Sequence, residues 1–322
     1  MFQQSNRRGA AGSAATLLEL VYHGIVRSVR KSHGNPLMSI AVNVLQTVVF
    51  VLAFYVMFNV LGLRGMALRG DFLIFIMTGI FLFLTHVKAL GAVLASEGPA
   101  SPMMQHAPMN TAVAILSAAL GSLYIQVLSA ALVLFVYHVA FTPVELDDPI
   151  GTVGMFLLAW FTGAAIGLVL LALKPWFPTF VSIFAMVYQR ANMIASGKMF
   201  VANMMPGYML AMFDWNPLFH AIDQSRGFAF ANYFPRNSSI EYPLTVGVVL
   251  LMLGLMGEYV TRRHASASWD ARRKPRGPEA GTTGRPRPST RGSGSGASDG
   301  CRGSPTTTCS APTPSTRSRR SA

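Results

Sequence analysis

The chain has 322 residues, of which 52% are hydrophobic and only 12% are charged. Soluble domains carry about 25% charged residues, so this composition and a mean hydropathy of +0.42 exclude an ordinary soluble protein. Residues 262–322 hold 13 Lys/Arg against 3 Asp/Glu, whereas residues 1–261 hold 13 against 10. The net charge of +13 therefore comes mainly from the C-terminal segment. Because no ordered basic face is visible in the sequence, we expect no nucleic-acid partner.

The first predicted element is an amphipathic helix from Thr16 to Lys31. One side carries apolar residues at helical spacing, and the opposite side carries charged ones: Leu18, Val21, Tyr22, Ile25 and Val29 against Glu19, His23, Arg27 and Arg30. This pattern is typical of a helix that lies along the inner membrane surface. A short connector before the first span is the alternative.

Six apolar segments that follow are predicted to span the membrane, because a span needs about 20 apolar residues. They run over Pro36–Leu61, Phe72–Ala95, Ala112–Phe141, Gly151–Leu173, Phe177–Phe200 and Pro243–Val260. An even number of spans places both termini on one side. Basic residues flank the first and last spans, so the positive-inside rule predicts cytoplasmic termini.

The inner loop Ser96–Asn110 has an unusual composition, with three prolines and two adjacent methionines. A short helix in this loop would lie along the membrane plane and dock into a cytoplasmic partner. The residues proposed for this coupling are Pro99, Pro102, Met103 and Met104. An ordinary connecting loop is the alternative.

Between the fifth and sixth spans the sequence predicts a re-entrant helical hairpin, from Met199 to Phe230. Two short apolar pieces are broken at Met205-Pro206-Gly207 and at Asp214–Pro217. Asn216 offers a side-chain oxygen to free N–H groups and Pro217 lacks a donor, which together predict a helix start. A non-helical turn at membrane depth requires surrounding protein or water. We therefore interpret this hairpin as the outer gate of a conduit.

The proposed gate residues are Pro206, Gly207, Trp215, Asn216, Pro217, His220, Asp223 and Arg226. The last three are spaced to share a helix face and pair locally; acid–base catalysis is the alternative reading. On the fifth span, aromatic residues at helical spacing and an arginine are proposed to line the path: Phe177, Phe180, Phe184, Tyr188 and Arg190. A lipid-facing aromatic stripe and a snorkelling or ion-paired arginine are the alternatives.

Two domains are predicted, a membrane domain over residues 1–263 and a disordered basic tail over residues 264–322. The tail is rich in Ser, Gly, Pro and Arg and cannot bury a core. Both cysteines, Cys301 and Cys309, lie in it. The tail would contact anionic lipid, or would be translated sequence beyond the natural end of the protein.

The order of these parts resembles the membrane subunits of type-2 ABC exporters, above all those for capsular and other bacterial surface polysaccharides. The resemblance covers about Leu17 to Arg263. It is carried by Ala195-Ser196-Gly197-Lys198-Met199-Phe200, then Met205-Pro206-Gly207, then Trp215-Asn216-Pro217-Leu218-Phe219-His220-Ala221-Ile222 and Arg226. The sequence departs from the pattern at Lys198, where family members carry an apolar residue, and in the long tail.

The resemblance implies an all-α permease of six spans in the bacterial inner membrane, working as a homodimer with a separate ATPase subunit. No phosphate-binding loop GxxxxGK[ST] occurs in the chain, so ATP would be bound by that partner. We expect no catalytic residue, metal site or cofactor in this chain. The expected cargo is a polysaccharide or glycolipid. The alternatives are a permease for a small lipid or drug, and a membrane-embedded enzyme that acts on lipid-linked sugars.

The topology can be tested by cysteine labelling. In a background in which both tail cysteines are replaced by serine, Asp147→Cys and Asn237→Cys should react with an impermeant thiol reagent in intact cells. Gln105→Cys, in the inner loop, should react only after membrane disruption. Labelling of Asp147→Cys only after disruption would overturn the predicted orientation.

Overall fold

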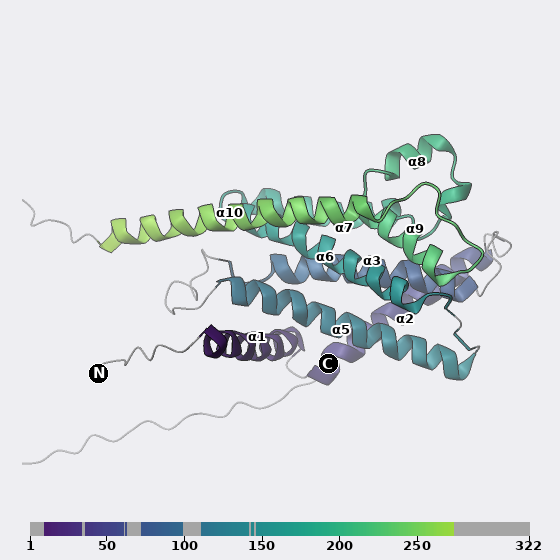
Figure 1. Ribbon diagram of the computed structural model, residues 1–322, viewed down its shortest axis with the longest axis horizontal. Helices are drawn as coiled ribbons and strands as arrows, with labels where there is room; N and C mark the ends of the chain where they lie inside the picture. The colour runs from purple at the N-terminus through teal and green to yellow at the C-terminus, as the bar shows by residue number, and fades with distance from the viewer. Residues whose placement is uncertain are drawn as a thin grey trace, which may run out of the picture. The chain divides into compact units, whose positions relative to one another are not determined.

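A computed structural model describes residues 10–33, 36–60, 62, 72–98, 111–141, 143–144 and 146–273. Over these residues the regular structure is entirely helical (Figure 1). The helices are α1 (Ala10–His33), α2 (Pro36–Val60), α3 (Phe72–Leu94), α5 (Thr111–Ala140), α6 (Pro149–Leu173), α7 (Pro178–Ala195), α8 (Gly207–Phe213), α9 (Pro217–Ala229) and α10 (Glu241–Arg273), with a 3₁₀ turn, η2 (Ala202–Met204). The predicted coupling loop, with Pro99, Pro102, Met103 and Met104, lies outside the described residues.

Five helical segments of the described chain are long and apolar enough to cross a membrane. They are α2 from Leu37, α3, α5, α6 and the part of α10 from Glu241 to His264. They correspond to the first, second, third, fourth and sixth predicted spans. α10 continues past Arg263, the predicted end of the membrane domain, to Arg273.

The predicted fifth span is shorter and more polar than expected. α7 begins at Pro178 and ends at Ala195, not at Phe200, because Ser196 and Gly197 leave the helix for a turn. Its last two turns carry Gln189, Arg190 and Asn192. It therefore does not belong to the five segments that qualify by length and apolar composition.

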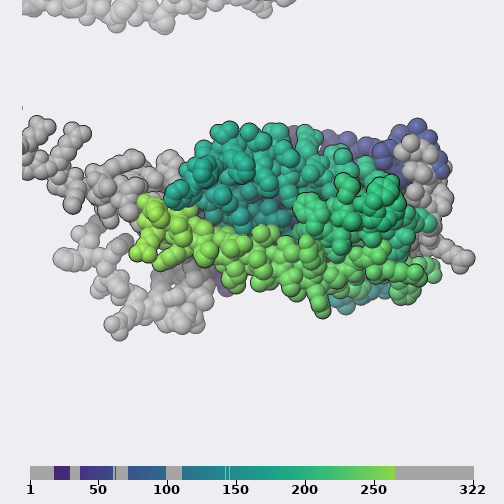
Figure 2. Space-filling model, turned by 90° about the horizontal axis from the view of Figure 1, so that it is seen from above, coloured from purple at the N-terminus to yellow at the C-terminus, as the bar shows by residue number. Residues whose placement is uncertain are grey.

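α3 is the central helix of the bundle. In its most apolar window 83% of the residues are buried, compared with 17% in that of α10. Within the described part of the chain, α3 contributes nine of the 24 buried residues of the largest core cluster, more than any other helix, and apolar side chains of α2, α6 and α9 pack around them. The opposite case is α10, which lies at the surface in the view of Figure 2 and carries many exposed apolar side chains between Leu244 and Val260.

Small residues let α6 approach its two neighbours closely. A Cβ on Gly163 would lie 2.4 Å from the His86 carbonyl oxygen of α3, and one on Gly167 would lie 2.8 Å from that of Leu90. On the other side of α6, a Cβ on Gly254 of α10 would lie 2.8 Å from Leu168. Small residues four apart are a common basis of helix packing in membranes, where dispersion contacts replace the hydrophobic effect.

α1 packs along α5, through the same kind of contact (Figure 1). A Cβ on Gly24 would lie 2.3 Å from the Ser117 hydroxyl, which also donates to the Val21 carbonyl at 3.3 Å. Of the predicted apolar side, Val29 is buried, whereas Leu18 and Tyr22 remain 71% and 63% exposed. The amphipathic helix thus buries half of its apolar side on α5 and leaves the other half uncovered.

The close contact of α6 with α3 can be tested with two glycines of one helix. Gly163→Ala should lower the melting temperature in detergent, because overpacking costs about 1–3 kcal/mol. Gly154→Ala is the matched control: its Cβ would meet nothing within 4 Å, and alanine is the better helix former. Equal melting temperatures of the two variants would show that α3 and α6 can move apart to accommodate the added methyl group without loss of stability.

Candidate functional site

The candidate site is the end of the bundle where α7, α8 and α9 meet. We call residues 196–240, from the end of α7 to the start of α10, the cap. It contains every residue of the predicted outer gate. Its position beside the first turns of α3 is visible at the α8–α9 end of Figure 1.

Asn216 joins the start of α9 to the end of α7. Its side-chain oxygen accepts from the Leu218 N–H at 3.1 Å, with Pro217 as the first helical residue, so the predicted helix start is confirmed. Its amide nitrogen donates to the Asn192 side-chain oxygen at 2.7 Å and to the Ala195 carbonyl at 3.0 Å. Asn216 is 4% exposed. It is therefore both a helix cap and a link between two helices.

The first piece of the predicted hairpin, Met199 to Phe213, begins as a turn and becomes α-helical only at Gly207. Gly197 has φ +68°, and a Cβ there would lie 2.5 Å from the Phe219 ring. Only glycine tolerates this combination of left-handed backbone and close contact. After the turn, η2 leads to α8, which begins at Gly207 directly after Pro206. The Pro206-Gly207 break therefore precedes the first helix of the cap, and the second break precedes α9.

Arg226 holds the turn from inside the protein. It is 1% exposed, and its guanidinium donates to the carbonyls of Gly197 (3.0 Å), Lys198 (2.7 Å) and Phe200 (2.6 Å). Its guanidinium carbon also lies 3.9 Å from the centre of the Phe75 ring of α3. Burial lowers the pKa of Arg226 to about 10, against the opposing charge of Asp223. The side chain thus remains charged at neutral pH.

Lys198 occupies an aromatic cage. Its ammonium lies 3.4 Å from the centre of the Phe83 ring, with the rings of Phe54 and Phe50 at 5.1 and 5.6 Å. The nitrogen has no hydrogen-bond partner and the residue is 3% exposed. Burial lowers its pKa to about 7, while the π faces favour the charged form. Lys198, at which the sequence departs from the exporter pattern, thus anchors the turn to α2 and α3.

His220 and Asp223 belong to separate hydrogen-bond networks. The Ser239 N–H points at Nδ1 of His220 (3.2 Å), so Nδ1 accepts and Nε2 donates, to the Asp214 carbonyl (2.6 Å). Asp223 accepts from the hydroxyls of Tyr233 and Ser238. Burial, with the neighbouring Asp223, raises the pKa of Tyr233. No hydrogen bond of the described residues joins His220, Asp223 and Arg226 to one another. Of the expected local pairing, the attraction between the charges of Asp223 and Arg226 is present, whereas His220 pairs with Asp214 instead.

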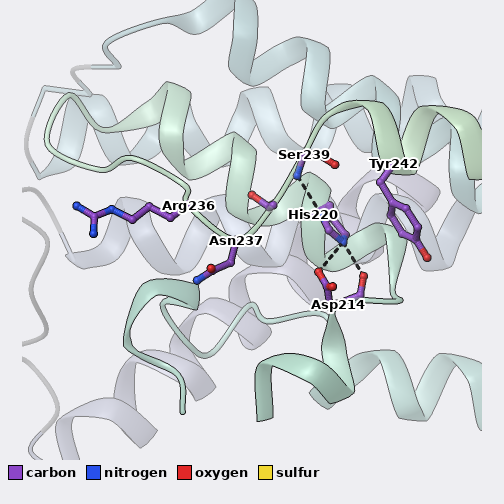
Figure 3. A pocket seen from close by; sticks show the side chains of 7 residues that line it. Asp214, His220, Arg236, Asn237, Ser239 and Tyr242 are labelled. Carbon is purple, nitrogen blue, oxygen red and sulfur yellow. Dashed lines mark hydrogen bonds and ion pairs between the residues drawn. The ribbon is translucent and has the colours of Figure 1, made fainter. Parts of the chain in front are cut away.

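A polar cavity of about 450 Å³ opens between α9 and the start of α10 (Figure 3). His220 forms its floor, with Asp214 on one side and the loop residues Arg236 and Asn237 on the other. Tyr242 completes the wall: its ring lies 4.7 Å from that of His220, and its hydroxyl donates to the Trp215 carbonyl at 2.8 Å. The cavity is not predictable from the sequence, because its walls come from three segments that only the fold brings together.

The residues proposed for the path differ in exposure along α7. Phe177, Phe180, Phe184 and Arg190 are exposed. The rings of Phe180, Phe184 and Tyr188 stack in a row, with centroids 6.0 and 6.3 Å apart. Tyr188 is half-buried, and its hydroxyl lies 3.0 Å from Nε2 of the buried His86 of α3.

Four residues of the cap and its supports were not predicted as functional: Asn192, Lys198, Tyr233 and Phe75. The only sequence signal among them is a lysine inside an apolar run, which is costly unless it is paired or enclosed. The described residues include no group of three His, Cys, Asp or Glu that could hold a metal ion.

Comparison with models of protein families and with curated proteins finds no match. The class of the protein is therefore inferred from its fold alone. The chain is an all-helical, multi-pass membrane protein with five long apolar helices in its described part. At one end a cap is tied to its core by a buried arginine and a buried lysine.

Arg226→Lys tests the role of the guanidinium. A lysine keeps the charge but cannot donate in the same fork to three carbonyls, and each hydrogen bond to a charged group contributes about 1.5–3 kcal/mol. We expect a lower melting temperature and faster proteolysis within the cap. Arg236→Lys is the matched control, because Arg236 is exposed and should tolerate the change. A melting temperature for Arg226→Lys equal to that of the control would show that the three guanidinium hydrogen bonds do not stabilise the cap.

Proposed function

We propose that the protein is the permease subunit of an ATP-driven exporter that moves a surface polysaccharide across the bacterial inner membrane. Two copies would form the path, and each would bind a separate ATPase subunit. This proposal carries forward the resemblance of Ala195–Phe200 and of Trp215–Ile222 with Arg226 to the exporter family. It places the cap at the outer end of the path as its gate.

The observation that carries the proposal is the exposed side of α7. Arg190 lies on it together with Phe180, Ile183, Phe184 and Ile194, most of a helix length from Pro178. If α7 lies within the membrane, as the proposal requires, an arginine that faces lipid near the helix centre costs about 2.5–3.5 kcal/mol on insertion scales. The cost is avoided if this side faces a water-filled path or a second copy of the chain. The stacked rings of Phe180, Phe184 and Tyr188 offer weak, repeated contacts to a sliding polar polymer.

The hydrogen bonds of the cap disfavour the enzyme alternative. A general acid or base must reach the proton that it transfers, directly or through one water, but His220 donates to Asp214, and Asp223 accepts from Tyr233 and Ser238. Both side chains are occupied in holding the cap together. Their positions suit a structural element that opens and closes as a unit.

Deletion of the gene separates the two functions. An exporter subunit predicts that the finished polysaccharide accumulates inside the cell while the surface is bare. An enzyme that builds the lipid-linked precursor predicts that the polymer is missing from both places. Immunoblotting of polysaccharide from intact and from disrupted cells distinguishes these outcomes, and a complementing plasmid controls for effects on neighbouring genes. Polymer missing from both fractions would refute the proposed export function.

The gate role can be tested at Asn216. Asn216→Ala removes a cap contribution of about 0.5–2 kcal/mol and the two bonds to α7. Because a gate balances states within a few kcal/mol, export should fall at normal membrane abundance. Asn216→Asp keeps the capping oxygen but loses the donated bonds, so it should be equally impaired if the link matters. Normal export by both variants, with loss of polymer in His220→Ala, would contradict the gate and favour the enzyme.

A further inference from the structure

We propose that the cavity between α9 and the start of α10 is a binding site for a saccharide unit. It lies over His220 and is bounded by Asp214, Arg236, Asn237, Ser239 and Tyr242. The inference rests on the proposed function in one respect: an exporter of polysaccharide would bring such a ligand to this face. The argument for the site itself depends on the cavity alone.

The first step is that the walls are built and fixed. Nε2 of His220 donates to the Asp214 carbonyl and lies 3.3 Å from its carboxylate, while Nδ1 accepts from Ser239. The Ser238 hydroxyl donates to the buried Asp223 at 2.7 Å, and Gln224 donates to the Ser238 carbonyl at 2.8 Å. The loop and the turn are therefore held against α9 by buried groups, as expected of a largely preformed ligand site.

The second step concerns the size and polarity of the cavity. Its volume, about 450 Å³, falls within the range of small-molecule sites, about 300–1,000 Å³. Carboxylate, imidazole, amide and hydroxyl groups line it, with one tyrosine ring, and Asp214, Asn237 and Ser239 are exposed. An acyl chain seated there would take these polar groups out of water without offering them hydrogen-bond partners, which is costly. The cavity thus suits a polar ligand and not a lipid tail.

The third step concerns the hydrogen-bonding groups that lie around His220. The Asp214 carboxylate only accepts hydrogen bonds, whereas the Asn237 amide both donates and accepts them. The Arg236 side chain extends away from Asp214 (Figure 3), so a small anion in the cavity would meet the carboxylate without a facing cation. Hydroxyl groups both donate and accept. A ligand with several neighbouring hydroxyls therefore satisfies the Asp214 carboxylate and the Asn237 amide at once, which is the chemistry of a sugar ring.

The chain supplies a reporter and a matched control. Trp215 follows Asp214 and is 66% exposed, with its carbonyl bonded to Tyr242, so its fluorescence should respond to a ligand in the cavity. Asn232 is an exposed asparagine on the same connection that does not line the cavity. Asn237→Ala and Asn232→Ala are thus the same chemical change inside and outside the site.

The experiment titrates the purified full chain in nanodiscs with glucose and with inorganic phosphate, and follows tryptophan emission. Glucose should change the emission of the wild type, and Trp215→Phe should abolish that signal. Asn237→Ala should raise the glucose concentration at half-maximal response about tenfold, the loss of affinity expected from one hydrogen bond. Asn232→Ala should bind glucose as the wild type does. Equal responses of the two alanine variants, no response to glucose, or a response to phosphate alone would overturn the site.

The outcome is separable from that of the exporter proposal. If glucose binds as described but deletion of the gene removes the polymer from the whole cell, the site stands and the export function fails. If deletion leaves polymer trapped inside the cell but glucose does not bind, the export function stands and this site fails.

Discussion

The cap depends on one buried charge, the guanidinium of Arg226. A charged group without water is costly unless hydrogen bonds compensate it. Here three backbone carbonyls of the 197–200 turn accept from the terminal nitrogens, while Nε has no partner among the described residues. The turn itself supplies one backbone bond, from the Phe200 N–H to the Gly197 carbonyl. The arginine and the turn therefore stabilise each other, and neither is expected to keep its conformation alone.

The same arginine connects the cap to the bundle. Its guanidinium lies over Phe75, and a Cβ on Gly79 would come within 3.0 Å of both its terminal nitrogen and Lys198. The absence of a side chain at Gly79 thus lets the Arg226 guanidinium and the Lys198 stem approach α3 closely. Lys198 then extends past it to Phe83. The charge of Asp223 stabilises the Arg226 guanidinium, and the aromatic faces stabilise the ammonium of Lys198. Any movement of the cap as a unit must break these contacts together.

Much of the fold follows from sequence, and the reasons for the failures are specific. Five segments were predictable because apolar length is a strong signal at the bilayer scale, and Asn216-Pro217 because capping is local chemistry. The end of α7 was placed at Phe200 because hydropathy continues through Met199 and Phe200, whereas Gly197 and the Arg226 bonds end the helix at Ala195. The pairing expected of His220, Asp223 and Arg226 is limited, for a related reason, to the attraction between the charges of Asp223 and Arg226. Helical spacing places residues on a face, but partners elsewhere in the chain, such as Tyr233 and Ser239, decide the contacts.

α7 and the cap form one mechanical element in this arrangement. α7 is joined to α3 through the Tyr188–His86 contact and to α9 through the Asn192–Asn216 bond. These polar contacts lie on one side of the helix, while its other side presents Phe180, Phe184 and Arg190 without cover. A shift of α7 would therefore be transmitted to the start of α9, and from His220 of α9 to Asp214 and Ser239 at the cavity. Polar side chains thus carry the connection from the exposed side of the bundle to the cavity, through contacts that can break and re-form without loss of the apolar core.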